Sequence, residues 1–197
     1  MIAAAPIACP RRFVFSGLVG SALVALALCL SLSPLSAATL PGEAGQITRL
    51  TPPAPIPELT ITDMNEQPTS LAAYKGKPLI VNLWATWCGP CIKEMPSLAK
   101  LAETLKSRGV TIVAISEDRG GKSVVEPFLA KNQISGLPIL LDKTSSAMKL
   151  MQAKVLPTTV LIDAEGREVA RVFGDREWDT QETQAEIADV FGLKASQ

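Results

Sequence analysis

Two short runs of apolar residues stand out in the middle of the chain. Residues 79–84 and 111–116 are apolar at most positions, and Asn82 is the polar exception inside the first run. Strands that are covered on both faces of a parallel sheet have such near-continuous apolar runs, whereas half-exposed strands alternate. We therefore predict that both segments are buried strands of one sheet.

A helical pattern fills the segment between these strands. From residue 88 to residue 108, apolar side chains recur every three or four positions, at Ile92, Met95, Leu98, Leu101, Ala102 and Leu105. Gly109 suits the residue that follows a helix C-terminus. The pattern thus predicts one long helix, with a kink near Pro96 because proline lacks the backbone donor.

The remaining elements are shorter. Strand patterns cover residues 58–63, 139–141, 158–162 and 168–173. Helices are expected after Ser123 and Asp179, which each precede a Glu by three positions as in a capping box, and over residues 145–153. Residues 163–166 fit a hairpin turn. Strands and helices in this order predict an α/β fold, in which a central mixed β-sheet is flanked by helices.

The first 38 residues have the pattern of a targeting segment. Arg11 and Arg12 precede a mostly apolar stretch, residues 13–32, that is long enough to cross a bilayer as a helix. A small-x-small pattern that ends at Ala38 offers a cleavage position. The length of the apolar stretch favours an uncleaved anchor with its N-terminus inside the cell, and a cleaved signal peptide is the alternative.

A proline-rich segment follows. Residues 39–57 contain five prolines, which predict an extended spacer with little capacity to join a core. We therefore divide the chain into a signal peptide or anchor (1–38), a linker (39–57) and one folded domain (58–197).

Charge and residue usage narrow the function classes. Lys and Arg number 19, as do Asp and Glu, so the chain lacks the basic excess of a nucleic-acid-binding surface. Histidine is absent, which excludes histidine bases and histidine zinc sites. Of the four cysteines, Cys9 and Cys29 fall in the targeting segment, so the domain keeps only Cys88 and Cys91. Two thiolates cannot fill a four-thiolate zinc site, and we predict neither a metal nor another cofactor.

The Cys88-Gly89-Pro90-Cys91 motif lies where the strand 79–84 gives way to the helix. A Cys-x-x-Cys pair at such a junction is typical of a redox site, in which two thiols form and release a small-ring disulfide. Cys88 falls at the helix N-terminus, whose N–H groups stabilise a thiolate, and Cys91 falls one turn further in. We therefore predict that Cys88 attacks a partner disulfide and that Cys91 resolves the mixed disulfide.

The stretch from Val81 to Cys91 resembles the thioredoxin superfamily. Its continuation, Ile92 to Pro96, resembles the TlpA/ResA/CcmG-like group of thiol–disulfide oxidoreductases, and TlpA most of all. The resemblance extends over residues 57–192 and implies a thioredoxin-like fold. It also implies that residues 117–153 form the central insert of the TlpA type.

The resemblance implies further functional residues. Thioredoxins carry a buried acid at the position of Asn82, whereas this group has an acid three residues after the second cysteine, which is Glu94 here. Burial would raise the pKa of Glu94 and let it exchange protons with Cys91; an ordinary solvated glutamate is the alternative. Pro157 matches the cis-proline that faces the cysteine pair in the superfamily.

Substrate binding is expected around the motif. Trp87 lies beside the attacking sulfur, with Gly89 and Pro90 after it, and we expect it to dock the partner. Trp84 is expected in the core. The backbone of Leu156–Pro157 would pair with an extended segment of the substrate, as in strand addition.

The dipeptide between the cysteines suggests the direction of electron flow. Gly-Pro is the dipeptide of thioredoxin, whose potential is about −270 mV, against about −120 mV for the oxidant DsbA. We therefore predict a reductant, anchored by residues 13–32 on the periplasmic side of the bacterial inner membrane. The family implies apocytochrome c or copper-site proteins as substrates, and a transmembrane electron donor of the DsbD/CcdA type. We expect a monomer that binds no nucleic acid.

Three alternatives remain at this point. A thiol peroxidase of the same fold would use Cys88 on peroxide, and Thr86 keeps this hypothesis open. A copper carrier is a binding protein instead of an enzyme, but the carriers of this fold use a histidine and a wider cysteine spacing. An oxidase or isomerase would need a more oxidising pair than Gly-Pro favours.

Overall fold

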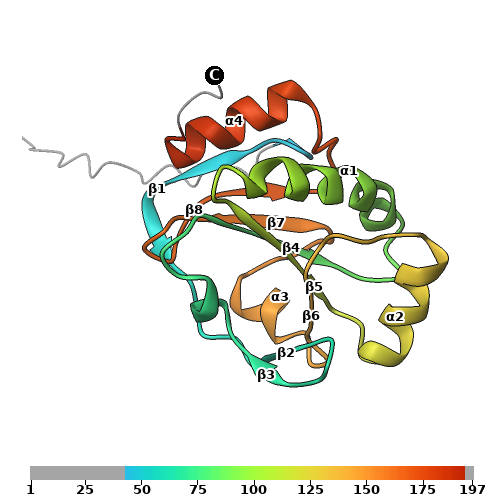
Figure 1. The fold of residues 1–197 in the computed structure, drawn as a ribbon. Helices are drawn as coiled ribbons and strands as arrows, with labels where there is room; N and C mark the ends of the chain where they lie inside the picture. The colour runs from blue at the N-terminus through green and yellow to red at the C-terminus, as the bar shows by residue number, and fades with distance from the viewer. Residues whose placement is uncertain (1–42, 194–197) are drawn as a thin grey trace, which may run out of the picture. The chain divides into compact units, whose positions relative to one another are not determined.

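The computed structural model of the chain describes residues 43–193 (Figure 1). The predicted targeting segment, with both of its alternatives, lies outside these residues. Within residues 43–193 no helix is both long and apolar enough to cross a membrane.

One eight-stranded sheet runs through the described domain, in the order β1-β8-β7-β4-β5-β6-β2-β3. The strands are β1 (Thr48–Pro55), β2 (Ile61–Asp63), β3 (Pro68–Thr69), β4 (Leu79–Trp84), β5 (Thr111–Ser116), β6 (Ile139–Leu141), β7 (Thr158–Ile162) and β8 (Arg167–Phe173). β4 is parallel to β5 and antiparallel to β7, so the sheet is mixed. The two apolar runs predicted as buried strands are β4 and β5, and the predicted α/β class is confirmed.

Helices cover both faces of this sheet. They are the 3-10 helix η1 (Leu71–Tyr74), α1 (Gly89–Lys106), α2 (Lys122–Lys131), α3 (Ser146–Leu150) and α4 (Gln181–Phe191). Buried side chains of α1, α2 and α4 form one core with Ile80 and Trp84 of β4, whereas η1 and α3 pack with Val81 and Leu83 on the other face. Figure 1 shows α1 and α4 on one side of the sheet and α3 on the other. Alternate side chains of β4 therefore enter two separate cores, which explains its unbroken apolar sequence.

Two helix starts differ from the predicted capping boxes. α2 begins after Gly121, and no side chain caps it, so Ser123 is not its N-cap. α4 begins after Thr180, whose hydroxyl oxygen accepts the N–H of Thr183, so the cap lies one residue beyond Asp179. Ser, Thr and Asp are all good N-caps, and adjacent candidates in the sequence do not show which one is used.

The predicted linker is wrong over part of its length, because residues 48–55 form strand β1. β1 pairs antiparallel with β8, from Thr48 opposite Arg171 to Pro55 opposite Arg167. The register shifts between Arg49 and Ala54, where Pro52 and Pro53 interrupt the supply of backbone donors. Proline is tolerated on an edge strand, since only one side of the strand is paired. The domain therefore begins before residue 58.

Residues 117–153 contribute α2, β6 and α3 and the turns between them. β6 pairs parallel with β5 and antiparallel with β2, so the segment is part of the main sheet. Its assignment as an insert of the TlpA type stays a prediction.

We predict that a chain beginning at residue 58 is less stable than one beginning at residue 43. The shorter chain loses β1 and the side chains of Ile47 and Ile56, which pack against the two cores. Loss of two partly buried isoleucines alone should lower the free energy of unfolding by about 2 kcal/mol. Urea denaturation of both chains measures this, and equal midpoints would show that residues 43–57 act only as a linker.

Candidate active site

The redox pair lies at the start of α1. Cys88 and Cys91 are joined by a disulfide, and Cys88 is the N-cap residue of the helix. The Cys88 sulfur accepts the backbone N–H of Cys91 at 3.3 Å. Pro90 occupies the first turn, where its lack of a backbone N–H costs nothing. After reduction, the unpaired N–H groups of this turn would stabilise a thiolate on Cys88.

The two sulfurs differ in accessibility. Cys91 is fully buried and Cys88 is 6% exposed, so an incoming thiol can reach only the Cys88 side of the disulfide. Trp87 beside it is 70% exposed, the largest value among the exposed large hydrophobic residues of the described chain. Trp84, in contrast, is fully buried in the core, as predicted.

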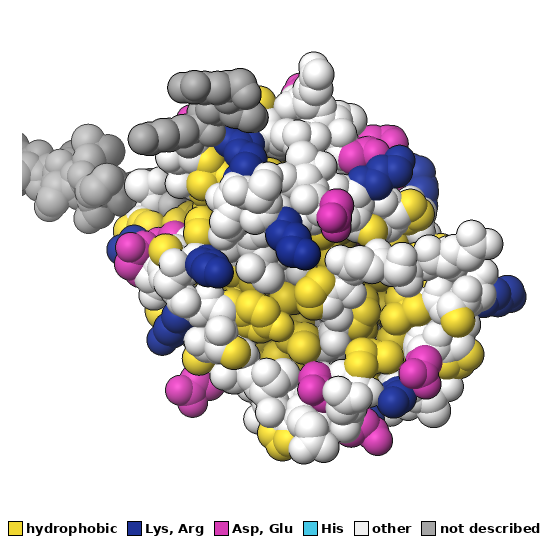
Figure 2. Space-filling model, in the orientation of Figure 1, with side chains coloured by type: hydrophobic (Ala, Val, Ile, Leu, Met, Phe, Trp, Pro, Cys, Tyr) yellow, Lys and Arg dark blue, Asp and Glu magenta, His cyan; other side chains and the backbone are white. Residues whose placement is uncertain are grey.

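The strand register places Pro157 at the end of the sheet where β4 leads to Cys88. The Leu156–Pro157 peptide bond is cis, and the next residue, Thr158, lies opposite Leu83 near the end of β4. Val155 just before it is 49% exposed. In Figure 2, hydrophobic side chains gather over the middle of the visible face, with charged side chains around them.

Glu94 lies one turn after Cys91 on α1 and is only 2% exposed. Three donors bind its carboxylate. The Asn82 amide donates to Oε1 at 2.8 Å, and the Trp178 indole N–H and the Arg176 backbone N–H donate to Oε2 at 2.9 and 3.2 Å. Burial raises the pKa of Glu94 to about 7, although the three hydrogen bonds act in the opposite direction. The group can therefore gain or lose a proton near neutral pH.

Sequence reasoning missed all three donors to Glu94. The loop 175–178 had no assigned role, yet it supplies two of the three donors to Glu94. Asn82 was expected only as the replacement for an acid, but its amide also donates to the Thr159 hydroxyl of β7 at 2.9 Å. The hydrogen bond from Trp178 joins positions 84 residues apart, and a contact of that span leaves no local sequence pattern.

A second carboxylate fixes the loop that precedes the redox pair. Asp118 accepts the backbone N–H and the hydroxyl of Thr86, at 2.9 and 2.6 Å, and the hydroxyl of Ser116 at 2.8 Å. Asp118 is 4% exposed, so these bonds replace its hydration. The loop 118–121, which had no assigned role, thus holds the backbone two residues before Cys88.

A third carboxyl group, Glu117, has no hydrogen-bond partner for either oxygen among the described residues. Burial raises its pKa to about 7, and the nearby charge of Asp142 adds to this effect. Ser145 and the Met148 backbone act in the opposite direction, although neither forms a hydrogen bond of normal geometry with it.

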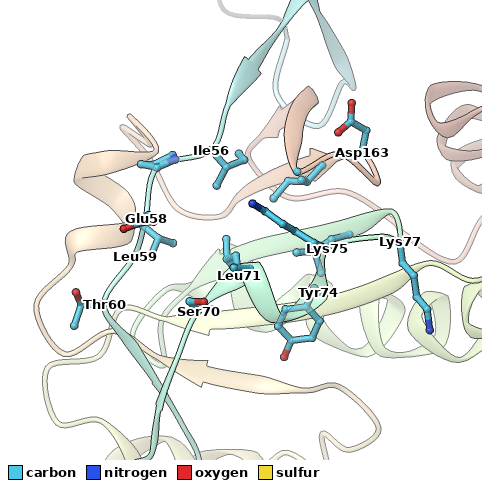
Figure 3. A pocket seen from close by; sticks show the side chains of 15 residues that line it. Ile56, Glu58, Leu59, Thr60, Ser70, Leu71, Tyr74, Lys75, Lys77 and Asp163 are labelled. Carbon is cyan, nitrogen blue, oxygen red and sulfur yellow. The ribbon is translucent and has the colours of Figure 1, made fainter.

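A cavity of about 350 Å³ lies at the opposite end of the sheet. Leu79 and Ile162 line it, and these two residues face each other at the far end of β4 from Cys88. Figure 3 shows Tyr74 and Lys75 among its lining side chains. No predicted site residue belongs to this cavity, so the redox chemistry does not depend on it.

With this geometry in view, comparisons with known proteins identify the family. The sequence pattern of the AhpC/TSA family matches residues 52–170, more than half of the chain. The chain belongs to the AhpC/TSA family. Within the thioredoxin superfamily it is a TlpA/ResA/CcmG-like protein, which confirms the resemblance found in the sequence.

Individual relatives agree with this assignment. The chain is 32% identical to the thiol-disulfide oxidoreductase ResA of a Bacillus cereus strain over 120 residues, which are 61% of this chain and 68% of that protein. It is 36% identical to ResA of Bacillus subtilis (strain 168) over 118 residues, 60% of this chain and 65% of ResA. The crystal structure of a thioredoxin family thiol:disulfide interchange protein from Chlorobium tepidum TLS is similar, with a TM-score of 0.54 and 28% identity. That match covers 68% of this chain and 97% of the Chlorobium chain.

We predict that the oxidised AhpC/TSA-family domain loses stability as the pH rises from about 4.5 to about 7. In the folded chain the pKa of Glu94 and of Glu117 is about 7, so both keep their protons at pH values where the unfolded chain, with pKa values near 4.5, has released them. Stability therefore falls across this window, by up to about 1.4 kcal/mol per pH unit for each group. Urea denaturation between pH 4 and pH 8 measures the slope.

Glu94→Gln and Glu117→Gln are the matched variants for this test. Each should remove about half of the slope, because the glutamine side chain does not titrate. A slope that stays unchanged in either variant would show that the corresponding carboxyl group titrates normally.

Proposed function

We propose that this chain is a reductant of cysteine pairs in exported proteins. The observation that carries the proposal is the Cys88–Cys91 disulfide at the N-terminus of α1, in which Cys91 is fully buried and only Cys88 keeps some solvent exposure. The ResA relatives, named thiol-disulfide oxidoreductases, support the same chemistry.

The proposed reaction has two exchange steps. In the reduced protein, the Cys88 thiolate attacks one sulfur of a substrate disulfide, which forms a mixed disulfide and releases the other sulfur as a thiolate. Cys91 then loses its proton and attacks the Cys88 sulfur. This breaks the mixed disulfide, releases the second substrate thiol and forms the Cys88–Cys91 disulfide. Two electrons pass to the substrate, and a second dithiol must restore the pair.

Glu94 is suited to accept the Cys91 proton. Helix spacing places the two residues on the same side of α1, one turn apart. A base with a pKa of about 7 is both available in its ionised form and able to hold the proton at neutral pH. Burial also keeps water from competing for this transfer.

Trp87 and the Leu156–Pro157 segment form the proposed docking surface. An exposed tryptophan beside a reactive sulfur can anchor an apolar side chain of the partner. An extended substrate segment would add its backbone hydrogen bonds at Leu156–Pro157. Gly89 and Pro90, which are both exposed, complete the proposed surface.

The cellular setting is part of the proposal. The apolar residues 13–32 support an anchor in the bacterial inner membrane with the domain in the periplasm, and cleavage near Ala38 is the alternative. An oxidising compartment requires a membrane donor, for which the DsbD/CcdA type is proposed. Apocytochrome c and copper-site proteins are the proposed substrates, and the chain is proposed to act as a monomer.

A thiol peroxidase is the second candidate, because Thr86 lies two residues before Cys88. In the structure the Thr86 hydroxyl donates to Asp118, so its proton is already committed. A copper carrier is less well supported, because the carriers of this fold use a histidine and a wider cysteine spacing, and the chain has no histidine.

We predict a reduction potential at or below about −230 mV for the Cys88–Cys91 pair, in the range of reductases. Equilibration of residues 43–197 with thiol buffers of known potential measures it. A potential near or above about −180 mV would place the pair with oxidases and isomerases, and the proposed direction would be wrong.

We also predict that Cys91→Ser traps substrates through Cys88. The reduced variant should accumulate a mixed disulfide with a peptide that carries a disulfide, because the resolving sulfur is missing. Cys88→Ser is the matched control and should form little adduct, since Cys91 is fully buried. Non-reducing electrophoresis and mass spectrometry measure the adducts, and equal trapping by both variants would contradict the assigned roles.

A further inference from the structure

The loop between β8 and α4 binds the active-site helix at two points one turn apart. The Trp178 indole N–H donates to Glu94 Oε2 at 2.9 Å, and the Trp178 backbone N–H donates to the Ser97 hydroxyl at 3.1 Å. The Ser97 hydroxyl in turn donates to the Glu94 carbonyl at 2.8 Å. Trp178 is fully buried, so no water can take the place of its indole N–H. Trp178 is thus held on α1 at two places, by its indole N–H at the Glu94 carboxylate and by its backbone N–H at the Ser97 hydroxyl.

The same loop is also bound to α4 through the Arg176 side chain. The Arg176 guanidinium donates to the hydroxyl of Thr183 at 2.7 Å and to Glu186 at 2.9 Å. It also lies 5.5 Å from the centre of the Trp178 ring, within the range of a cation–π contact. The backbone N–H of Arg176 meanwhile donates to Glu94 Oε2. The position of Trp178 therefore depends on α4 as well as on α1.

The indole N–H favours one of the two protonation states of Glu94. An indole N–H can donate a hydrogen bond but cannot accept one. It therefore favours the ionised carboxylate over the protonated acid, which would itself need an acceptor. Burial has the opposite effect on Glu94, because it disfavours the charged form. The donors to Oε2 thus offset a burial that would otherwise keep the proton on Glu94.

Few other charges act on this carboxylate. Asp175 disfavours its ionisation, and Asp175 is itself paired with Lys93 at 2.9 Å. The Arg176 guanidinium is engaged by Glu186 on α4. The contacts from the sheet come from neutral groups, the Asn82 amide and, next to it, the Thr159 hydroxyl. The hydrogen bonds to Glu94 are therefore the main means by which its ionised form is stabilised.

We propose that Trp178 is a positioning residue for Glu94: its indole N–H, with the backbone N–H of Arg176, holds one carboxyl oxygen and keeps the group able to accept a proton from Cys91. The transfer from Cys91 rests on the proposed role of Glu94 in the exchange reaction. The placement of the carboxylate and its state of ionisation can be tested without that role.

The chain contains a matched control for this test. Trp84 is also fully buried and belongs to the same core, but its indole N–H has no partner among the described residues. Phenylalanine at either position removes an indole N–H and part of a buried ring. Only the change at Trp178 removes a hydrogen bond to Glu94, so the loss of packing is separated from the loss of the donor.

The decisive experiment is a titration of the Glu94 side-chain carboxyl by carbon NMR in the oxidised full chain. Trp178→Phe should raise the Glu94 pKa by about one pH unit, whereas Trp84→Phe should leave it unchanged. Arg176→Met, which keeps the backbone N–H but removes the guanidinium contacts with Thr183 and Glu186 of α4, should shift it in the same direction by less. This second variant keeps the test open if Trp178→Phe does not fold. An unchanged titration in the folded variants at both loop positions would overturn the proposal.

A kinetic measurement separates this proposal from the proposed function. The rate at which Cys91 resolves a mixed disulfide should fall roughly fivefold at pH 7 in Trp178→Phe and recover above pH 8, because a one-unit shift leaves about a tenth of the base ionised at pH 7. Trp84→Phe should keep the original pH profile. If Glu94→Gln also leaves the profile unchanged, Glu94 is not the base and the proposed function loses that step. The NMR titration still decides whether Trp178 positions the carboxylate.

Discussion

The buried carboxyl group of Glu94 connects three parts of the chain at the redox site: α1, β4 and the loop before α4. Glu94 of α1 accepts one hydrogen bond from Asn82 of β4 and two from the loop before α4, which lies more than 80 residues further along the chain. An ionised group in such a place is expensive unless every oxygen is bound, so the surrounding elements are constrained to supply donors. The sheet, the active-site helix and the C-terminal helix are thereby fixed relative to one another around one oxygen pair.

The loop before the redox pair depends on a comparable contact. Asp118 binds both the backbone and the hydroxyl of Thr86, which fixes the approach of the chain to Cys88. Asp118 therefore fixes the loop before the cysteine pair, and the contacts of Glu94 fix the helix that follows it. Such support suits a reaction in which the attacking and leaving sulfurs must be nearly in line, because small displacements of a reacting atom are costly.

The elements that follow from local sequence patterns could be predicted, whereas the long-range contacts could not. The continuous apolar runs and the helical spacing predicted β4, β5 and α1 to within a few residues, since each element must bury a defined set of side chains. The motif similarly pointed to Cys88 and Cys91, whereas Glu94 was predicted from the resemblance to the TlpA/ResA/CcmG-like group. β1 was missed because its prolines are typical of a spacer, and only the free edge of β8 makes it a strand. Trp178 was missed because nothing near it in the sequence indicates a partner 84 residues away.

The edges of the sheet bear on how such a protein meets its substrates. A chain that handles extended, cysteine-bearing polypeptides risks pairing with them along any free strand, as aggregating proteins do. One edge here is β1, in which Pro52, Pro53 and Pro55 cannot donate backbone hydrogen bonds. The other is β3, only two residues long and begun by Pro68. Both outer strands thus offer poor templates for backbone pairing, so the margins of the sheet discourage the addition of an extended polypeptide.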